Sequence, residues 1–117
     1  MAAPNIATAQ NAYGHTAVQA VTTGATAIVS GSTGHLMKVV SLIVANVGSG
    51  ATADITADLY RSSTAYRIGY TITVPPKTSV VLIVKDSPIY VEEADTFRLT
   101  ASANSMLEAT ATYEDVY

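Results

Sequence analysis

Apolar and polar residues alternate along most of this chain, and this two-residue period constrains the fold more than any other feature. In residues 53–60 every second position is apolar (Ala, Ile, Ala, Leu), and the positions between are Asp, Thr, Asp and Tyr. Successive side chains of a β-strand point to opposite faces, so this pattern predicts a strand with one buried and one wet face. The same period recurs in residues 66–74, 97–102 and 107–114, and no stretch has a helical period.

Short turn signals separate the alternating runs. Gly-rich or Pro-rich segments occur at residues 31–34, 48–50 and 75–76, and Ala-Asn-Ser occurs at 103–105. About eight short strands divided by such turns are typical of an all-β fold, an antiparallel β-sandwich of the immunoglobulin-like or jelly-roll type. A chain of 117 residues is long enough for one such core. We therefore predict a single β-sandwich domain over residues 17–117.

Residues 1–16 follow no clear period and are rich in Ala, Asn, Gln and Thr. We predict that they form an extended N-terminal arm, and a disordered tail is the alternative. Ile6 and Tyr13 are the side chains that such an arm could insert into a neighbouring subunit. Both are therefore interface candidates.

Two predicted strands, residues 36–47 and 79–84, differ from the others because they are apolar at consecutive positions. Their apolar side chains therefore fall on both faces of a sheet. In a two-sheet sandwich the outer face is exposed unless a partner covers it. We expect partner subunits to contact these strands, and the interface candidates are Val40, Leu42, Val44, Val81 and Ile83.

The position of a tyrosine in the apolar–polar alternation of its strand predicts whether it lies in the core or on the surface, and the chain has seven tyrosines. Tyr66 and Tyr70 fall on the apolar phase of their strand, so we expect them to pack in the core. Tyr60 falls on the polar phase, and Tyr117 is the last residue of the sequence. Tyr60 and Tyr117 are therefore further interface candidates, since exposed aromatic residues often anchor protein interfaces.

Charged residues make up only 13% of the chain, about half the fraction of roughly a quarter that is usual in soluble proteins. This deficit suggests that much of the surface contacts other protein, although a neutral exterior rich in Ser and Thr is the alternative. The net charge is −3 and the six basic residues are scattered singly, so no basic stripe predicts a nucleic-acid partner. The longest apolar stretch, residues 39–47, is too short to span a membrane.

Residues that could carry chemistry are few and isolated. The two histidines, His15 and His35, are not at ligand spacing, and the chain has no cysteine. Asp54 and Asp58 share a strand face with their Cα atoms roughly 13 Å apart, which suits solvation better than paired-carboxylate catalysis. The acidic residues at 92, 93 and 95 lack the alternating ligand spacing of a calcium loop. We predict no enzyme activity, no metal site and no cofactor.

Several segments together resemble a known class of protein. They are residues 39–46 (VVSLIVAN), 53–60 (ADITADLY), 73–76 (TVPP), 90–95 (YVEEAD) and 107–114 (LEATATYE). The chain resembles small β-sandwich virion structural proteins of tailed bacteriophages, particularly those of cyanobacterial and other marine phages. Such proteins usually have a Gly-Asp corner before the penultimate strand, where this chain has Ala94 and Asp95.

The resemblance implies a virion component that is present in many copies, and it does not distinguish the capsid surface from the tail, neck or baseplate. The capsid surface is the expected location. The protein's expected partners are copies of itself and the major capsid protein or another virion protein. The leading hypothesis is a capsid decoration or cement protein that packs on the shell and stabilises it. One alternative is a tail, neck or baseplate component, and another is a carbohydrate-binding adhesion module.

Overall fold

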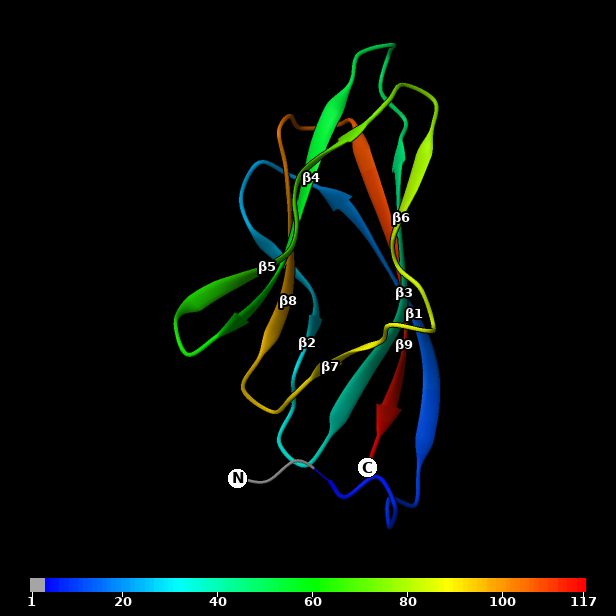
Figure 1. Cartoon of the computed structure of the whole chain (residues 1–117), viewed down its shortest axis with the longest axis vertical. Helices are drawn as coiled ribbons and strands as arrows, with labels where there is room; N and C mark the ends of the chain where they lie inside the picture. Colours follow the sequence, from blue (N-terminus) through cyan, green and yellow to red (C-terminus); the bar gives the residue numbers. More distant parts are fainter. Residues whose placement is uncertain (1–3) are drawn as a thin grey trace.

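The computed structural model describes residues 4–117, and in this part of the chain all regular structure is β-strand. The strands are β1 (Ala12–Val21), β2 (Thr26–Ser30), β3 (Leu36–Asn46), β4 (Ala53–Arg61), β5 (Thr64–Val74), β6 (Ser79–Ile83), β7 (Ile89–Val91), β8 (Thr96–Ala101) and β9 (Leu107–Val116). They form two layers that face each other (Figure 1). The predicted antiparallel β-sandwich is confirmed.

Each layer is one antiparallel sheet. Sheet A has the strand order β1-β9-β3-β6, and β7 pairs with β3 beside β6. Sheet B has the order β2-β8-β4-β5. The pairs are nested, since β4 pairs with β5, β3 with β6 and β7, β2 with β8, and β1 with β9, and successive pairs alternate between the sheets. This nesting is the arrangement of a jelly roll, one of the two sandwich types that the sequence left open.

The core lies between the two sheets and is built from the inward positions of the alternating strands. Its largest fully buried apolar side chains are Phe97, Leu42, Ile55, Leu99 and Leu107. Leu42, Val44 and Ile83, three of the predicted interface residues, lie in this core and are at most 2% exposed. The prediction that they contact a partner subunit is therefore wrong, because β3 and β6 turn these side chains toward sheet B.

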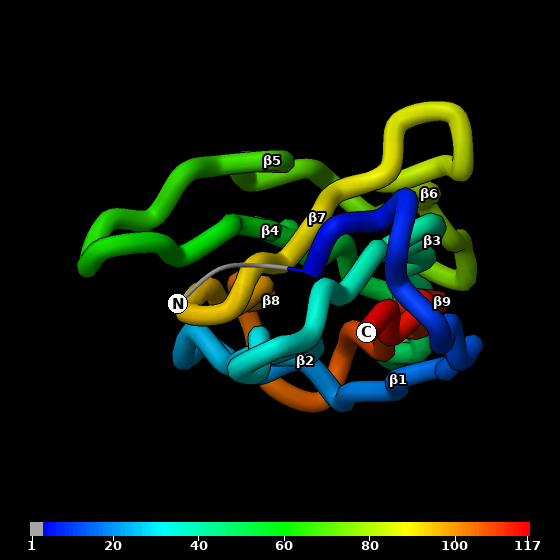
Figure 2. Tube along the Cα trace, turned by 90° about the horizontal axis from the view of Figure 1, so that it is seen from below, coloured from blue at the N-terminus to red at the C-terminus, as the bar shows by residue number. Residues whose placement is uncertain are grey.

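The N-terminal boundary also differs from the prediction. Residues 12–16 were predicted as part of an arm, but they belong to β1 and pair with the end of β9. Asn11 and Tyr117 continue this pairing, with backbone N···O distances of 2.7 and 3.0 Å. Figure 2 shows the preceding residues (dark blue) crossing this end of the molecule before β1 begins. The first three residues of the predicted arm lie outside the described part.

The alternation predicted for β5 is interrupted in the structure. The register between β4 and β5 shifts on both sides of Ala57, and Thr71 has a positive φ of 46°. Tyr66 and Tyr70 are 57% and 64% exposed, so the prediction that they pack in the core is wrong. A bulge changes the face to which later side chains point. Tyr66 lies near the β4–β5 hairpin end, which projects beyond the rest of sheet B (Figures 1 and 2).

Candidate interaction surfaces

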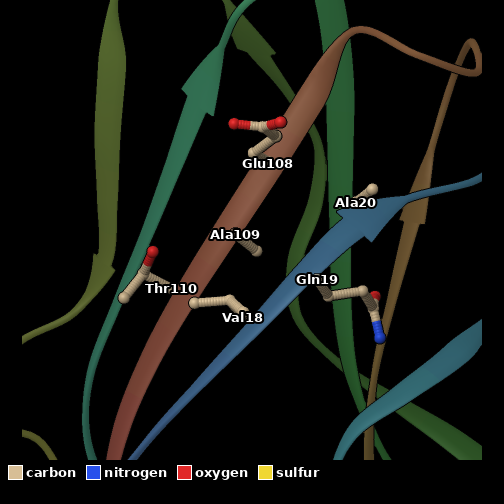
Figure 3. A pocket seen from close by; sticks show the side chains of 6 residues that line it. All are labelled: Val18, Gln19, Ala20, Glu108, Ala109 and Thr110. Atoms are coloured by element: carbon tan, nitrogen blue, oxygen red, sulfur yellow. The ribbon is translucent and has the colours of Figure 1, made fainter.

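The outer face of sheet A carries an apolar row that crosses all four main strands. Val18 of β1 pairs with Thr110 of β9, Thr110 with Ile43 of β3, and Ile43 with Val81 of β6. Val18, Ile43 and Val81 are 75%, 40% and 56% exposed. Figure 3 shows Val18 and Thr110 side by side on neighbouring strands. We call Val18, Thr110, Ile43 and Val81 the apolar row.

The rows on either side of the apolar row carry almost no charge. One contains Thr16, Thr112 and Ser41, and the other contains Ala20, Glu108, Ala45 and Ser79. Glu108 is the one charged residue among these positions, and a shallow hollow of about 290 Å³ lies beside it between β1 and β9 (Figure 3). An exposed, neutral, partly apolar sheet face of this kind is typical of a protein interaction surface.

The outer face of sheet B is charged instead. Arg98, Asp58 and Arg67 occupy one row across β8, β4 and β5. Arg98 Nε lies 3.0 Å from Asp58 Oδ1, and Arg67 Nη1 lies 3.2 Å from Asp58 Oδ2. The Asp58 side chain is fully buried beneath the two guanidinium groups. The prediction that Asp58 solvates the surface is therefore wrong, and its role is to hold neighbouring strands together.

Tyr60 is half-buried beside this ion pair network. The Arg98 guanidinium carbon lies 3.9 Å above the centroid of the Tyr60 ring, a cation–π contact that covers one face of the ring. Tyr70 also has a guanidinium over its ring, since the Arg67 guanidinium carbon lies 5.2 Å from the ring centroid, but Tyr70 is exposed. It lies at the rim of a second shallow hollow of about 290 Å³. Polar side chains line that hollow, among them Asp54, Thr56, Arg67, Thr71, Thr100 and Ser102.

The acidic corner before β8 is neutralised by an arginine. Arg61 Nε donates to Asp95 Oδ1 at 2.8 Å, and Arg61 Nη2 donates to Glu92 Oε2 at 2.7 Å. Asp95 is buried and also accepts a hydrogen bond from the Glu92 backbone N–H at 3.0 Å. The Arg61 hydrogen bond lowers the pKa of Asp95 below its ordinary value, and the Glu92 N–H acts in the same direction against the effect of burial. The Glu92 and Asp95 carboxylates are therefore engaged in ion pairs with Arg61.

A glycine allows this corner to pack against the turn after β2. Gly31 N–H donates to Asp95 O at 2.9 Å. A Cβ atom at Gly31 would lie 1.9 Å from the backbone oxygen of Glu92, which is far closer than van der Waals contact permits. Only glycine therefore fits at this position without moving the backbone.

A cluster of aromatic and imidazole rings lies at the end of sheet A near the chain termini. His35 Nδ1 lies 2.7 Å from Asp115 Oδ1, and the His35 ring centroid is 4.3 Å from that of Tyr117. Tyr13 lies beside Tyr117 at 5.9 Å, and partial burial, with Tyr13 and Asp115 nearby, raises the pKa of Tyr117 above its ordinary value. The structure thus brings together two interface candidates, Tyr13 and Tyr117, that are distant in the sequence.

The predicted interface residues fall into three groups. Ile6, Tyr13, Val81 and Tyr117 are exposed, Val40 and Tyr60 are half-buried, and Leu42, Val44 and Ile83 belong to the core. The sequence reasoning missed Val18 and Ile43 as candidates. The strand period would have indicated them, because Ile43 must face away from Leu42 and Val44.

Residues 4–117 hold no group of three His, Asp or Glu side chains placed to bind a metal ion. In the same residues, no helix is long and apolar enough to cross a membrane. No protein-family model matches the chain, and no curated protein matches it.

Proposed function

We propose that this chain is a non-enzymatic structural protein of a virion, a decoration or cement protein that packs on a phage capsid and stabilises the shell. The observation that carries this proposal is the outer face of sheet A, where an exposed apolar row is flanked by two rows in which Glu108 is the one charged residue. Its partners would be the major capsid protein or another virion protein, together with copies of the chain itself.

Repeated docking sites on a shell would make a modest contact energy significant. Apolar surface that leaves water contributes roughly 25 cal/mol per Å², so burying one such face yields a modest gain. A shell presents the same docking site many times, and symmetric repetition multiplies that gain over the whole particle. The jelly-roll arrangement agrees with this role by analogy, since viral capsid domains and lectins both use it.

The docking face can be tested by changing its charge. Ile43→Glu combined with Val81→Glu should abolish binding of the purified protein to isolated capsid shells, because each substitution would bury a carboxylate against the shell. Thr64→Glu combined with Tyr66→Glu is the matched control, since both side chains are exposed on β5 of sheet B. Cosedimentation with shells measures the effect. Equal loss of binding in both variants would contradict docking through sheet A.

Localisation distinguishes the shell from a tail, neck or baseplate position. Cryo-electron microscopy of whole particles should show density for this jelly roll on the capsid surface. Its copy number, measured by quantitative mass spectrometry, should be comparable to that of the major capsid protein. A copy number equal to that of one tail ring would overturn the decoration role and favour the tail alternative.

A carbohydrate-binding adhesion module is the second candidate, and one observation favours it. The hollow on sheet B combines an exposed Tyr70 ring with several hydroxyl groups, which is the chemistry that stacks on and hydrogen-bonds to sugars. Glycan-array binding that is lost in Tyr70→Ala and retained in Tyr66→Ala would support this function. Absence of binding across a broad array would remove it.

A further inference from the structure

Most edges of the two sheets are protected against pairing with another chain. An edge strand exposes unpaired N–H and C=O groups, and natural proteins guard such edges by short length, bulges, charge or Pro. β2 and β6 have five residues each and β7 has three, and β2 and β6 also show register shifts. β5 has two register shifts against β4 and carries Arg67.

β1 is the exception among these edges. It has ten residues, its register with β9 is unbroken, and it contains no Lys, Arg, Asp, Glu or Pro. Among the described residues, no strand pairs with the far side of β1. Its side chains are exposed from Ala12 to Thr16 and again at Val18 and Ala20. β1 is thus a long edge with unbroken register and without the short length, bulges, charge or Pro that guard the other edges.

The backbone groups that β1 leaves unpaired can be identified from the neighbouring residues. Asn11 and Tyr117 exchange both backbone hydrogen bonds and continue the register of β1 with β9. Hydrogen-bonded and non-hydrogen-bonded pairs alternate in an antiparallel ladder, so odd-numbered residues of β1 bond to β9. The even-numbered residues therefore point their N–H and C=O groups away from the sheet. They are Ala12, Gly14, Thr16, Val18 and Ala20.

We infer that two copies of this chain pair antiparallel through β1, about a two-fold axis that passes through Thr16. This register places Ala12 opposite Ala20 of the partner subunit and Gly14 opposite Val18 of the partner subunit. Thr16 faces Thr16 of the partner subunit. All five edge-facing residues then find partners, which makes about ten new backbone hydrogen bonds.

Three features of β1 favour a second copy over another occupant. The strand carries no fixed charge, so two identical strands meet without repulsion. Thr16 is the middle one of the five edge-facing residues, so a two-fold axis at this position pairs all five with the second copy. The space around Gly14, where an added Cβ would contact nothing, accommodates the exposed Val18 of the second copy.

The pairing also extends the docking surface. A two-fold axis perpendicular to the sheet keeps both outer faces of sheet A on the same side, so two apolar rows lie on one continuous face. The proposed function includes self-association, and the β1 edge is the surface through which it would occur. The pairing itself does not depend on where the protein resides. A monomeric protein would overturn the β1 pairing and leave the capsid proposal standing, whereas absence from particles would do the reverse.

The oligomeric state of the purified chain is the first test. Light scattering coupled to gel filtration should give twice the 12.1 kDa chain mass at micromolar concentration. Thr16→Lys, which puts two ammonium groups face to face on the axis, should give the monomer mass. Val81→Lys, an equal charge change on β6, should remain dimeric. A monomeric wild type, or a dimer that survives Thr16→Lys, would overturn the proposal.

Cross-linking tests the register directly. The chain has no cysteine, so a single introduced thiol reports on one position. In a hydrogen-bonded antiparallel pair the Cα atoms are about 5.5 Å apart, which lies within the range that a disulfide spans. Thr16→Cys should form a covalent dimer on mild oxidation, and Val81→Cys should stay monomeric on a non-reducing gel. Efficient cross-linking of Val81→Cys with none at Thr16→Cys would contradict pairing through β1.

Discussion

At the scale of single residues, the protein has few charged groups, and several of them form ion pairs within the fold. Asp58 is enclosed by Arg98 and Arg67, and Asp95 by Arg61 and the backbone of Glu92. A buried carboxylate is costly unless it is paired and hydrogen-bonded, so these arginines offset the cost of burying the two aspartates.

The unequal burial of the two arginines around Asp58 predicts unequal mutational effects. Arg98 is largely covered and Arg67 is about half exposed. Arg98→Met should lower the free energy of unfolding by about 3 kcal/mol, because it leaves the buried Asp58 carboxylate with one partner, Arg67, whose side chain is half exposed. Arg67→Met should cost about 1 kcal/mol or less. Urea denaturation measures both, and equal losses would contradict the assigned geometry.

The lowered pKa of Asp95 predicts that the protein loses stability at low pH. Its pKa in the folded protein lies below the ordinary value of 3.8, so the stabilisation is fully present above that value. The stabilisation is lost as the pH falls through the folded pKa, where the carboxylate must be protonated. Asp95→Asn should therefore flatten the decrease in melting temperature below about pH 4. Asp86→Asn, at an exposed loop position, is the control and should keep the wild-type pH profile.

At the scale of elements, β3 shows how one strand serves two purposes. It pairs with β9 on one side and with β6 and β7 on the other, so it lies inside sheet A. Its inward side chains build the core, whereas Ile43 contributes to the apolar row on the outer face. β3 is therefore apolar on both faces because it is a central strand. Most of its apolar residues build the core, and Ile43 is exposed on the outer face.

Neighbouring residues of β3 should respond in opposite ways to truncation. Leu42→Ala should cost about 2–5 kcal/mol of stability, because it removes a fully buried side chain and leaves a cavity. Ile43→Ala should change stability by less than about 1 kcal/mol, since its side chain is on the outer face. Thermal unfolding of monomeric Thr16→Lys protein avoids any contribution from dimer contacts. Similar costs at the two positions would show that both face the core.

At the scale of the whole molecule, the nested jelly roll joins segments that are far apart in the sequence. β1 pairs with β9 and β2 pairs with β8, and the β4–β5 hairpin is the main local pairing. The same nesting brings His35 to Asp115 and Tyr13 to Tyr117 at one end of sheet A. The aromatic cluster near the termini is therefore a product of topology.

This topology predicts slow folding. Non-local strand pairs must close long loops before they gain contacts, and all-β domains of this kind fold in roughly milliseconds to seconds. Stopped-flow refolding of the Thr16→Lys monomer should give rates in that range. Substitutions in the β4–β5 hairpin should slow folding more than equally destabilising substitutions in β1, because the hairpin closes the shortest loop. A microsecond refolding phase that accounts for the full signal would contradict this prediction.

The amino-acid sequence by itself determined the fold class and the position of most strands, but not the first five residues of β1 or the bulges of β5. Alternation marks half-buried strands such as β4 and β9 because the side chains of a strand change face at every residue. Gly and Pro clusters mark the turns because of their own backbone preferences, so these elements could be located without any knowledge of their neighbours. The core phase of β4, with Ile55 and Ala57 inward, is correct for the same reason.

Only the tertiary structure decided which surfaces remain exposed. The sequence cannot show that bulges in β5 release Tyr70 to solvent, that Leu42 is covered by sheet B, or that Asp58 lies beneath two arginines from other strands. These properties depend on strand order and register, which are set by contacts among residues distant in the chain. The unprotected edge of β1 is of the same kind, because a strand becomes an edge only when the remaining strands have found their partners.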